Sequence, residues 1–466
     1  MRIKINPQTF LEFRGSHLKI TQEYYYRYKI VNEILSENPQ IVTLFHRDAS
    51  MGCRSEERRR AATFTSDQLL RAILVMEIEQ LSLRATVIRI DDSEFLRRFV
   101  GIPYGSVMDY TTLGKVYKAI RPGTWQRINA CLGEWAIGQG KIRGESLRVD
   151  TTAYETDVHY PTDSRLLWDS YRVLSRWIRE VREYDSEVVG EGRLQDRGVK
   201  RIAFEIARRA SHKEKSRGKL KGLYEALISH VEWVLEWSGE VAAGCEKGWV
   251  EGVNEPEQAR ILQGLLTRRV PYVEPIARVL DQARRRVLSG EVVPNGEKIF
   301  SLFEPHTELL KRGKACKPLE FGHMVLLGQV ENQFISDYEV FEKRPNEALL
   351  VEGILERHEA MFGDYPDSFT ADRGFYESME QLGSLEELIE NVSIAKKGSR
   401  NEEEIEREHD PVFKTLQRFR AGIEGTISYL KRCFKMARCL YRSFKTYCAS
   451  VGCHVFAHNL VVLSRL

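Results

Sequence analysis

The sequence predicts an α/β protein in which a mixed-sheet core is interrupted by a helical insertion and preceded by a helical N-terminal domain. Three observations carry this prediction. Residues 146–154 and 368–372 have the apolar-polar alternation that is typical of strands. Residues 165–300, which lie between them, have the three- and four-residue apolar spacing of helices. Residues 66–120 show the same helical spacing, interrupted by glycine and proline.

The composition is that of a globular protein in which the basic residues are clustered in parts of the chain. The chain has 466 residues, of which 42% are hydrophobic and 29% charged, and its net charge is +3. This length suits two or three domains. None of the eight cysteines belongs to a C-x-x-C pair, so reduced thiols are expected and a zinc site is disfavoured. No signal peptide or apolar run of membrane-span length is apparent, so we expect a cytoplasmic protein.

Four short helices are expected between Ser66 and Ile120. Their candidate N-caps are Ser66 or Asp67, Ser82, Asp92, and Thr111 or Thr112. Short helices joined by tight turns are typical of helix-turn-helix modules that contact DNA. A helical domain that only packs on the core would have the same pattern, and the sequence leaves both interpretations open.

The first strand carries an acidic residue, Asp150, although aspartate is disfavoured in strands. Asp150 shares one face with Arg148 and Thr152, and Val149 lies on the other face. It is either a surface acid near the strand end or a metal ligand held on a rigid element.

A polar turn at 159–164 leads from this strand into the insertion. Thr162 or Asp163 can cap a helix that begins near Arg165. Asp163 could instead approach a metal site, and the role of His159 stays open. The apolar periodicity beyond this turn indicates an antiparallel helical bundle.

Within the insertion, residues 197–222 are strongly basic, and Glu205 and Glu214 are far outnumbered. One-sided charge favours contact with phosphates, whereas the solvated face of a dimerisation bundle is the alternative. The residues expected to face DNA are Arg208, Arg209, Lys213, Lys215, Arg217, Lys219 and Lys221.

Strand character returns after the insertion. Residues 321–341 predict a hairpin, and further elements are expected at 349–361 (helix), 368–372 (strand), 377–388 (helix) and 392–395 (strand). The strand at 368–372 ends in Asp372, and Gly374 permits a tight turn. An ordinary aspartate turn at a strand end is the alternative to a functional carboxylate.

A long helix is expected from Pro411, with Asp410 as its N-cap. A polar stripe runs along it beside the apolar face, formed by Gln417, Arg420, Glu424, Ser428 and Lys431. Arg420 and Glu424 could simply form a solvated ion pair. However, Gly422 and Gly425 each cost the helix about 1 kcal/mol relative to alanine. This cost favours the close approach of another backbone, such as a nucleic acid strand.

Asp150, Asp372 and Glu424 form an ordered set of carboxylates that suits a two-metal phosphodiester site. Hard divalent cations prefer carboxylate oxygens as ligands. Two such ions about 3.5–4 Å apart activate the attacking oxygen and stabilise the leaving one.

The sequence resembles bacterial insertion-sequence DDE transposases of the ISNCY-like group. The resemblance rests on RVDTTAYETDVHYPTDS (148–164), FEPHTELLKRGKACKPLEFGHMVLL (303–327), ADRGFYE (371–377) and the Arg420-x3-Glu424-x6-Lys431 pattern that precedes a basic C-terminal helix. It covers most of the chain from about residue 66 onward. The family motif usually has a tyrosine three residues before the arginine, where this chain has Gln417.

The resemblance implies a ribonuclease-H-like core whose three carboxylates bind two Mg²⁺ ions, for which Mn²⁺ can substitute. The implied enzyme cleaves double-stranded DNA at the terminal inverted repeats of the element and joins the 3′-hydroxyl ends to target DNA. It would act as a homodimer on DNA, at the nucleoid and away from membranes. Arg373, Arg420 and Lys431 would contact phosphates. The alternatives are a nuclease of the same fold that only hydrolyses, and a non-catalytic DNA-binding protein descended from a transposase.

Five parts are expected along the chain. They are a helical N-terminal DNA-binding region (1–140), the first core strand and turn (141–164), the helical insertion (165–315), the remainder of the ribonuclease-H-like core (316–440) and a basic C-terminal helical tail (441–466).

Overall fold

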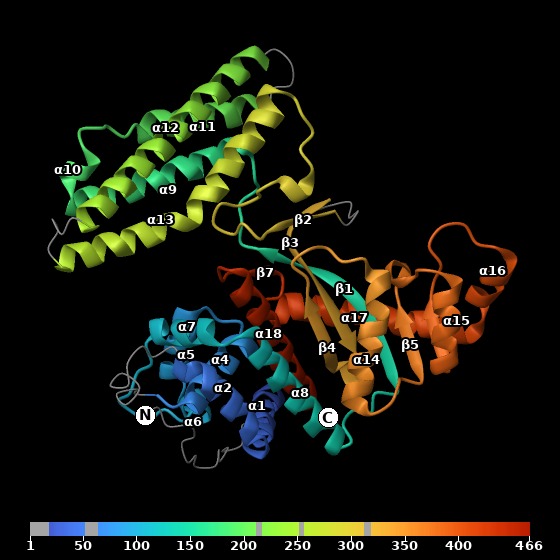
Figure 1. Ribbon diagram of the computed structural model, residues 1–466. Helices are drawn as coiled ribbons and strands as arrows, with labels where there is room; N and C mark the ends of the chain where they lie inside the picture. The colour runs from blue at the N-terminus through green and yellow to red at the C-terminus, as the bar shows by residue number, and fades with distance from the viewer. Residues whose placement is uncertain (1–17, 52–63, 211–216, 251–255, 312–317) are drawn as a thin grey trace. The chain divides into compact units, whose positions relative to one another are not determined.

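The computed structural model describes residues 18–51, 64–210, 217–250, 256–311 and 318–466 (Figure 1). The chain divides into two compact units. The first comprises Met1–Asp157 and Gly322–Leu466, and the second comprises Val158–Phe321. The segment 165–315, where the sequence predicts an insertion, lies within the second unit.

The predicted mixed α/β core is found as an open sheet that has seven strands among the described residues. The strands are β1 (Ser146–Thr156), β2 (Glu308–Lys311), β3 (Leu319–Gln329), β4 (Ile335–Val340), β5 (Ser368–Ala371), β6 (Asn391–Ile394) and β7 (Arg438–Cys439). The order is β2-β3-β1-β5-β6, with β4 paired to β3 and β7 to β1. β1 runs antiparallel to β3 and parallel to β5, and β5 runs parallel to β6.

The predicted hairpin at 321–341 is confirmed by the antiparallel pairing of β3 with β4. Its turn contains Asn332 and Gln333, whose φ angles of 55° and 65° are uncommon for residues with a side chain. The carboxylate of Glu331 accepts a hydrogen bond from the backbone N–H of Ser146 at 2.8 Å. This bond ties the turn to the start of β1.

The helices before β1 are α1 (Lys19–Glu37), α2 (Pro39–Met51), α4 (Ser66–Ile78), α5 (Leu83–Asp92), α6 (Glu94–Val100), α7 (Tyr110–Ala119) and α8 (Pro122–Gly138). Ser82 caps α5 as predicted, because its side chain accepts from the backbone N–H of Ala85. The other three caps differ from the predicted ones by one or two residues and are Thr65, Ser93 and Asp109. Thr65 prevails at α4 because it completes a reciprocal capping box with Gln68.

One hydrophobic cluster contains residues of the described N-terminal helices and of the sheet, and both belong to the first compact unit. Its centre includes α18 (Phe444–Leu463), which is long and apolar enough to cross a membrane. The sequence-based expectation that no such run exists is therefore wrong. However, 94% of the apolar stretch of α18 is buried inside the protein, as in the core helix of a soluble protein. The segment 441–466 thus contributes a core helix and is not an appended tail.

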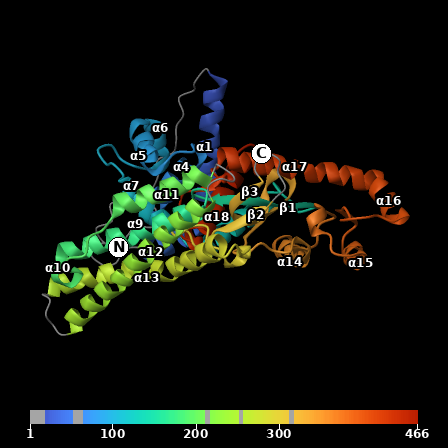
Figure 2. The ribbon, with the colours of Figure 1, turned by 90° about the horizontal axis from the view of Figure 1, so that it is seen from above.

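The remaining helices of the first unit follow β4. They are α14 (Val351–Phe362), α15 (Met379–Leu388), α16 (Glu402–His409) and α17 (Pro411–Cys433), with short 3₁₀ segments η4 (Glu347–Leu350) and η5 (Arg373–Phe375). α17 packs against β1, β5 and β6, and Figure 2 shows α14 on the other side of the sheet. The predicted cap of α17 is confirmed, because the Asp410 carboxylate accepts from the backbone N–H groups of Val412 and Phe413.

The second unit is a helical bundle with its own hydrophobic cluster. Its main helices are α9 (Asp163–Tyr184), α10 (Ser186–Val189), α11 (Asp196–Ala210), α12 (Arg217–Val250) and α13 (Pro256–Ala283). Thr162 caps α9. Asp163 accepts hydrogen bonds from Gln282 at 2.8 Å and from Arg286 at 2.8 and 2.9 Å. Asp163 therefore has a structural role in the bundle, and the His159 side chain is exposed.

Candidate active site

The register of β1 and β5 brings Asp150 and Asp372 to equivalent positions. The pairing of these parallel strands includes Arg148 opposite Thr370. Asp150 lies two residues further along β1, and Asp372 lies two residues beyond Thr370, directly after the end of β5. Continuation of the strand alternation by these two residues would place both carboxylates on the same face. Neighbouring strands lie about 4.8 Å apart. The two aspartates, 222 positions apart in sequence (372 − 150), therefore become neighbours.

The Asp372 carboxylate is fixed by the turn that follows it. Asp372 caps η5, and its Oδ1 accepts a hydrogen bond from the backbone N–H of Gly374 at 2.7 Å. A side chain at Gly374 would collide with the carboxylate of Glu347, which also accepts a hydrogen bond from the Thr151 hydroxyl. Gly374 thus leaves room for the Glu347 carboxylate beside the turn. The sequence alone had indicated only a turn.

Glu424 reaches this region from α17, and Arg420 links it to Asp150. The Arg420 guanidinium lies 3.8 Å from Asp150 Oδ2 and 3.4 Å from Glu424 Oε1. The side chains of Asp150 and Arg420 are only 13% and 18% exposed, whereas that of Glu424 is 66% exposed. A cation that belongs to the protein therefore stands between two of the three predicted carboxylates.

A hollow of about 550 Å³ opens beside Asp372, and we call it the Asp372 hollow. It is lined by Asp372, Arg373, Ala395, Glu408, Phe413, Lys414, Gln417, Arg418 and Arg420. Four of these residues are cations, so the hollow suits a phosphate group next to the aspartates. Sequence reasoning included Arg373 and Arg420 but missed Lys414 and Arg418. Their i, i+4 spacing on α17 could have indicated them.

The other predicted DNA-contacting residues that the structure describes are not among those that line the Asp372 hollow. Lys431 lies on α17 seven residues beyond Glu424, which is about 10 Å along a helix. Arg208 and Arg209 are paired with the carboxylate of Glu205. Lys219 and Lys221 are exposed on α12. Lys213 and Lys215 lie outside the described residues, as does the side chain of Arg217.

Gly422 makes room for an arginine of the protein itself. The Arg148 guanidinium stacks on the ring of Phe419 at 4.5 Å and donates to the backbone oxygen of the same residue at 2.6 Å. A Cβ atom at Gly422 would collide with this guanidinium. The predicted approach of a nucleic acid strand is thus not needed to explain Gly422. A Cβ at Gly425 would meet nothing within 4 Å, and no contact explains that glycine.

Gln417 holds α17 against the ends of two strands. The Gln417 Nε2 donates to two oxygens of Ser393 on β6. These are the backbone oxygen, at 2.9 Å, and the side-chain Oγ, at 3.0 Å. The Ala371 oxygen, at the end of β5, lies 3.5 Å from the same nitrogen. Gln417 therefore has a positioning role at the place where the resembling family usually has tyrosine.

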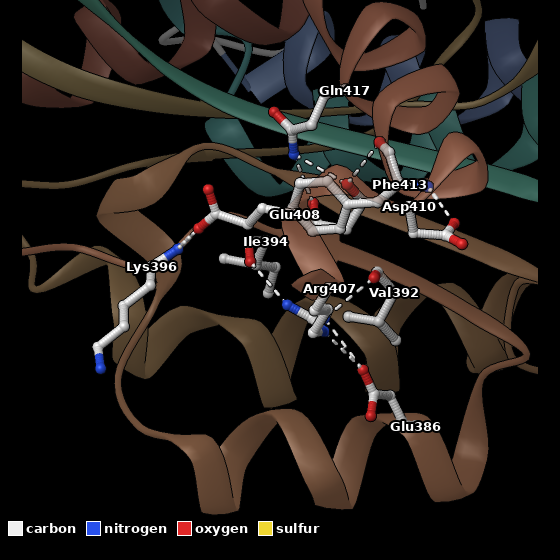
Figure 3. A network of polar contacts seen from close by, with 10 residues as sticks. Glu386, Val392, Ile394, Lys396, Arg407, Glu408, Asp410, Phe413 and Gln417 are labelled. Atoms are coloured by element: carbon white, nitrogen blue, oxygen red, sulfur yellow. Dashed lines mark hydrogen bonds and ion pairs between the residues drawn. The ribbon is translucent and has the colours of Figure 1, made fainter. Parts of the chain in front are cut away.

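A network around Phe413 fixes the start of α17 (Figure 3). Arg407 of α16 donates to the backbone oxygens of Val392 and Ile394 on β6, and its guanidinium lies 5.3 Å from the Phe413 ring centre. The Glu408 carboxylate accepts from the backbone N–H of Lys396 at 3.0 Å. These contacts join α16 and α17 to β6, the edge strand that is paired with β5.

The carboxylate set suits a divalent metal ion in its chemistry. Asp150 and Asp372 offer hard oxygen ligands from a rigid sheet, which Mg²⁺ prefers. Among the residues that the structure describes, however, no three His, Cys, Asp or Glu side chains gather closely enough to hold a metal ion. Glu424 could join the two aspartates only if the Arg420 guanidinium moved. The chain matches no family model, no curated protein and no solved structure.

Proposed function

We propose that the protein is a DDE transposase with a ribonuclease-H-like catalytic core. The observation that supports the proposal is the parallel register of β1 and β5, in which Arg148 and Thr370 are paired two residues before Asp150 and Asp372. Glu424 is supplied by α17, which packs against both strands. The sequence resemblance names the same three residues. The basic lining of the Asp372 hollow supports the choice of a phosphodiester as the substrate.

In the proposed reaction, the chain's own residues bind and orient a DNA phosphate. Arg373, Lys414 and Arg418 hold the phosphate in the Asp372 hollow. Arg420 leaves the carboxylates and contacts a phosphate oxygen when DNA binds. Asp150, Asp372 and Glu424 would hold two Mg²⁺ or Mn²⁺ ions, which supply activation of the attacking oxygen and stabilisation of the leaving one. Water attacks at the element end, and the freed 3′-hydroxyl then attacks the target DNA.

The proposed partner is double-stranded DNA, both the terminal inverted repeats and the target. We propose a homodimer on DNA that acts in the cytoplasm at the nucleoid. A hydrolytic nuclease of the same fold is the nearest alternative. A specific observation favours the non-catalytic alternative, because Arg420 already compensates Asp150 and Glu424 without a metal ion.

The experiment uses the purified chain, Mg²⁺ and a plasmid that carries this gene with its flanking DNA. Wild-type protein should nick at the element ends and yield strand-transfer products. The variants Asp150→Asn, Asp372→Asn and Glu424→Gln should each reduce cleavage by at least about 10³-fold, because each removes a charged ligand. Their DNA affinity, measured by anisotropy, should stay within about twofold of wild type.

The products separate the candidates. Nicking without strand transfer would support the nuclease. DNA binding without metal-dependent nicking in the wild-type protein would support the non-catalytic alternative. Near-normal cleavage by any one variant would remove that residue from the site.

A further inference from the structure

A second hollow, of about 820 Å³, lies within the first unit, and we call it the Tyr110 hollow. It is bounded by the turn between α4 and α5, by α7 and by residues 435–442, and it shares no lining residue with the Asp372 hollow. Tyr110 stands at the start of α7, and Leu440 is 70% exposed. The proposed reaction assigns no role to this hollow.

The positive charge of the Tyr110 hollow favours the binding of an anion. Its described lining contains Arg84, Lys118, Lys435, Arg438 and Arg442 and no carboxylate. Several of these cations have partners in the protein, and Arg84 donates a hydrogen bond to the Tyr110 hydroxyl at 3.4 Å. Arg438 pairs with Glu155 and Asp157 at 3.5 and 3.7 Å, and Lys435 donates to two backbone oxygens at 2.6 and 2.9 Å. Arg84 and Lys118 are both exposed, on α5 and α7.

The hollow also offers flat apolar surfaces. The Arg84 guanidinium lies 4.8 Å from the centre of the Tyr110 ring. Tyr441 lines the hollow and is stacked on Tyr117, with ring centres 4.3 Å apart. Because Tyr117 is buried behind it, the Tyr441 ring is held in place. A ligand that combines an anionic group with a planar ring fits this lining better than an anion alone.

The polar floor of the hollow is rigid. His454 is 2% exposed, and its two ring nitrogens lie 2.9 Å from Glu77 Oε2 and 3.2 Å from the Tyr154 hydroxyl. Two lining residues, Gln80 and Lys435, have φ angles of 56° and 57°. Such backbone conformations are uncommon for residues with a side chain and often occur at binding sites.

We propose that the Tyr110 hollow binds one nucleotide of an unpaired DNA strand. Arg84 and Lys118 contact its phosphate, and the base lies against Tyr110 or Tyr441. A base inside a duplex is stacked on its neighbours and offers no face, whereas an unpaired nucleotide offers both a face and a phosphate. The inference rests on the proposed function, because cutting a strand at an element end creates an end that can leave the duplex.

The test measures binding of a labelled single-stranded oligothymidine to the full-length chain in EDTA. Arg84→Glu and Lys118→Glu should each weaken binding about tenfold, since a phosphate contact is replaced by repulsion. The matched controls are Arg89→Glu on α5 and Lys115→Glu on α7, which are exposed but outside the hollow. They should change binding by less than about twofold. Equal losses in all four variants would mean general electrostatic attraction and would overturn the proposal.

Two further arms identify the ligand. Tyr110→Leu should weaken binding about fivefold and Tyr110→Phe should not, because stacking on an aromatic ring contributes most of the base contact. An abasic oligonucleotide of equal length should bind the wild-type protein as weakly as Tyr110→Leu binds the intact strand. If the abasic strand binds normally, the hollow takes phosphate only. If free thymidine monophosphate competes as well as the strand does, the ligand is a free nucleotide.

The EDTA condition separates this proposal from the proposed function. Asp150→Asn should bind oligothymidine normally while it loses cleavage. If wild-type protein cleaves DNA but binds no single strand through Arg84, the Tyr110 proposal alone is wrong. If it binds the strand through Arg84 but never cleaves, the transposase proposal alone is wrong.

Discussion

Arg420 determines the charge balance among the carboxylates. It contacts Asp150 and Glu424 at 3.8 and 3.4 Å, and its own side chain is largely buried. The side chains of Arg420 and Asp150 are both largely buried, so this pair attracts more strongly than an exposed pair does. A divalent cation at Asp150 must therefore compete with this guanidinium, and DNA phosphates can draw the guanidinium away.

Replacing Arg420 should consequently separate metal binding from catalysis. Arg420→Ala should bind Mn²⁺ roughly tenfold more tightly in the absence of DNA, because a competing cation is removed. The same variant should cleave DNA more slowly, since a phosphate contact is lost. Calorimetric titration with Mn²⁺ measures the first effect. Arg418→Ala is the control. It removes another cation from the lining of the Asp372 hollow and should leave the Mn²⁺ affinity unchanged. Equal Mn²⁺ affinities for wild type and Arg420→Ala would show that Arg420 does not compete.

The two glycines of α17 should respond oppositely to the same substitution. Gly422→Ala should lower the free energy of unfolding by about 1–3 kcal/mol, because its Cβ collides with the buried Arg148 guanidinium. Gly425→Ala should raise it by up to about 1 kcal/mol, because alanine favours the helix and the space is open. Urea denaturation measures both. If Gly425→Ala is stabilising but weakens DNA binding, the close approach of a DNA strand predicted from the sequence applies to Gly425 alone.

At the scale of elements, patterns among neighbouring residues predicted α17 and β1. The candidate active site depends instead on strand pairing between distant parts of the chain. The Asp410 cap follows from neighbouring residues, so the sequence was sufficient for it. The buried face of α17 begins at Phe413, whereas the neighbouring Val412 is 52% exposed. Phe413 is drawn inward by Arg407 and β6, which local periodicity cannot reveal. The register of β1 with β5 joins residues more than two hundred positions apart, and no local pattern encodes it.

The insertion has a second basic surface besides the one that the sequence predicts. Arg208 and Arg209 share Glu205 as a partner. A hollow between α9 and α11 has a largely basic lining. It is lined by Trp168, Arg172, Ser175, Arg176, Arg179, Asp196, Arg197 and Lys200. Arg172 and Arg179 are paired with Asp169 and Asp196. Helical packing brings these cations together from separate helices. Arg197 and Lys200 belong to the basic run at 197–222, whereas Arg172, Arg176 and Arg179 of α9 lie outside it.

We therefore expect the α9–α11 hollow to contact DNA more strongly than the end of α11 does. The triple variant Arg176→Gln, Arg197→Gln, Lys200→Gln should lower DNA affinity and reduce the salt slope by up to about 3, one unit for each lost phosphate contact. Arg208→Gln with Arg209→Gln is the comparison and should change the slope by less than about 1, since Glu205 already compensates these residues. Filter binding across salt concentrations measures both. If affinity holds and the triple variant becomes monomeric in gel filtration, the bundle serves dimerisation.

At the scale of the whole molecule, α18 joins the N-terminal helices to the sheet. Buried titratable groups on α18 and on other helices of the first unit make the free energy of unfolding depend on pH. Burial lowers the pKa of His458 to about 4, and its ring packs between Tyr429 and Phe434. Burial also lowers the pKa of His358, which contacts the Gly144 oxygen at 3.0 Å. Burial alone would raise the pKa of Glu77, but His454 and Lys435 lower it. All three shifts favour the folded state at neutral pH over acid pH.

The effect of His458 on the pH dependence of the free energy of unfolding follows from its proton binding in the folded and unfolded states. Above pH 6.5 the imidazole is neutral in both states, so it contributes no pH dependence. Between about pH 4 and 6.5 the unfolded chain binds a proton that the folded chain excludes. The free energy of unfolding should therefore fall by up to about 1.4 kcal/mol per pH unit on acidification, for this residue alone. His358 adds to the slope in the same direction.

The substitution His458→Phe should flatten this dependence, because phenylalanine keeps an aromatic ring between Tyr429 and Phe434 but cannot bind a proton. Urea denaturation between pH 5 and 6.5 gives the slope, and this range lies above the usual pKa of Glu77. The slope should decrease by roughly 1 kcal/mol per pH unit, whatever the variant's stability at neutral pH. His409→Asn is the control, because the His409 side chain is exposed in the folded protein and should leave the slope unchanged. An unaltered slope in His458→Phe would mean that α18 admits the proton without unfolding, and that the centre of the first unit is less tightly closed than its packing indicates.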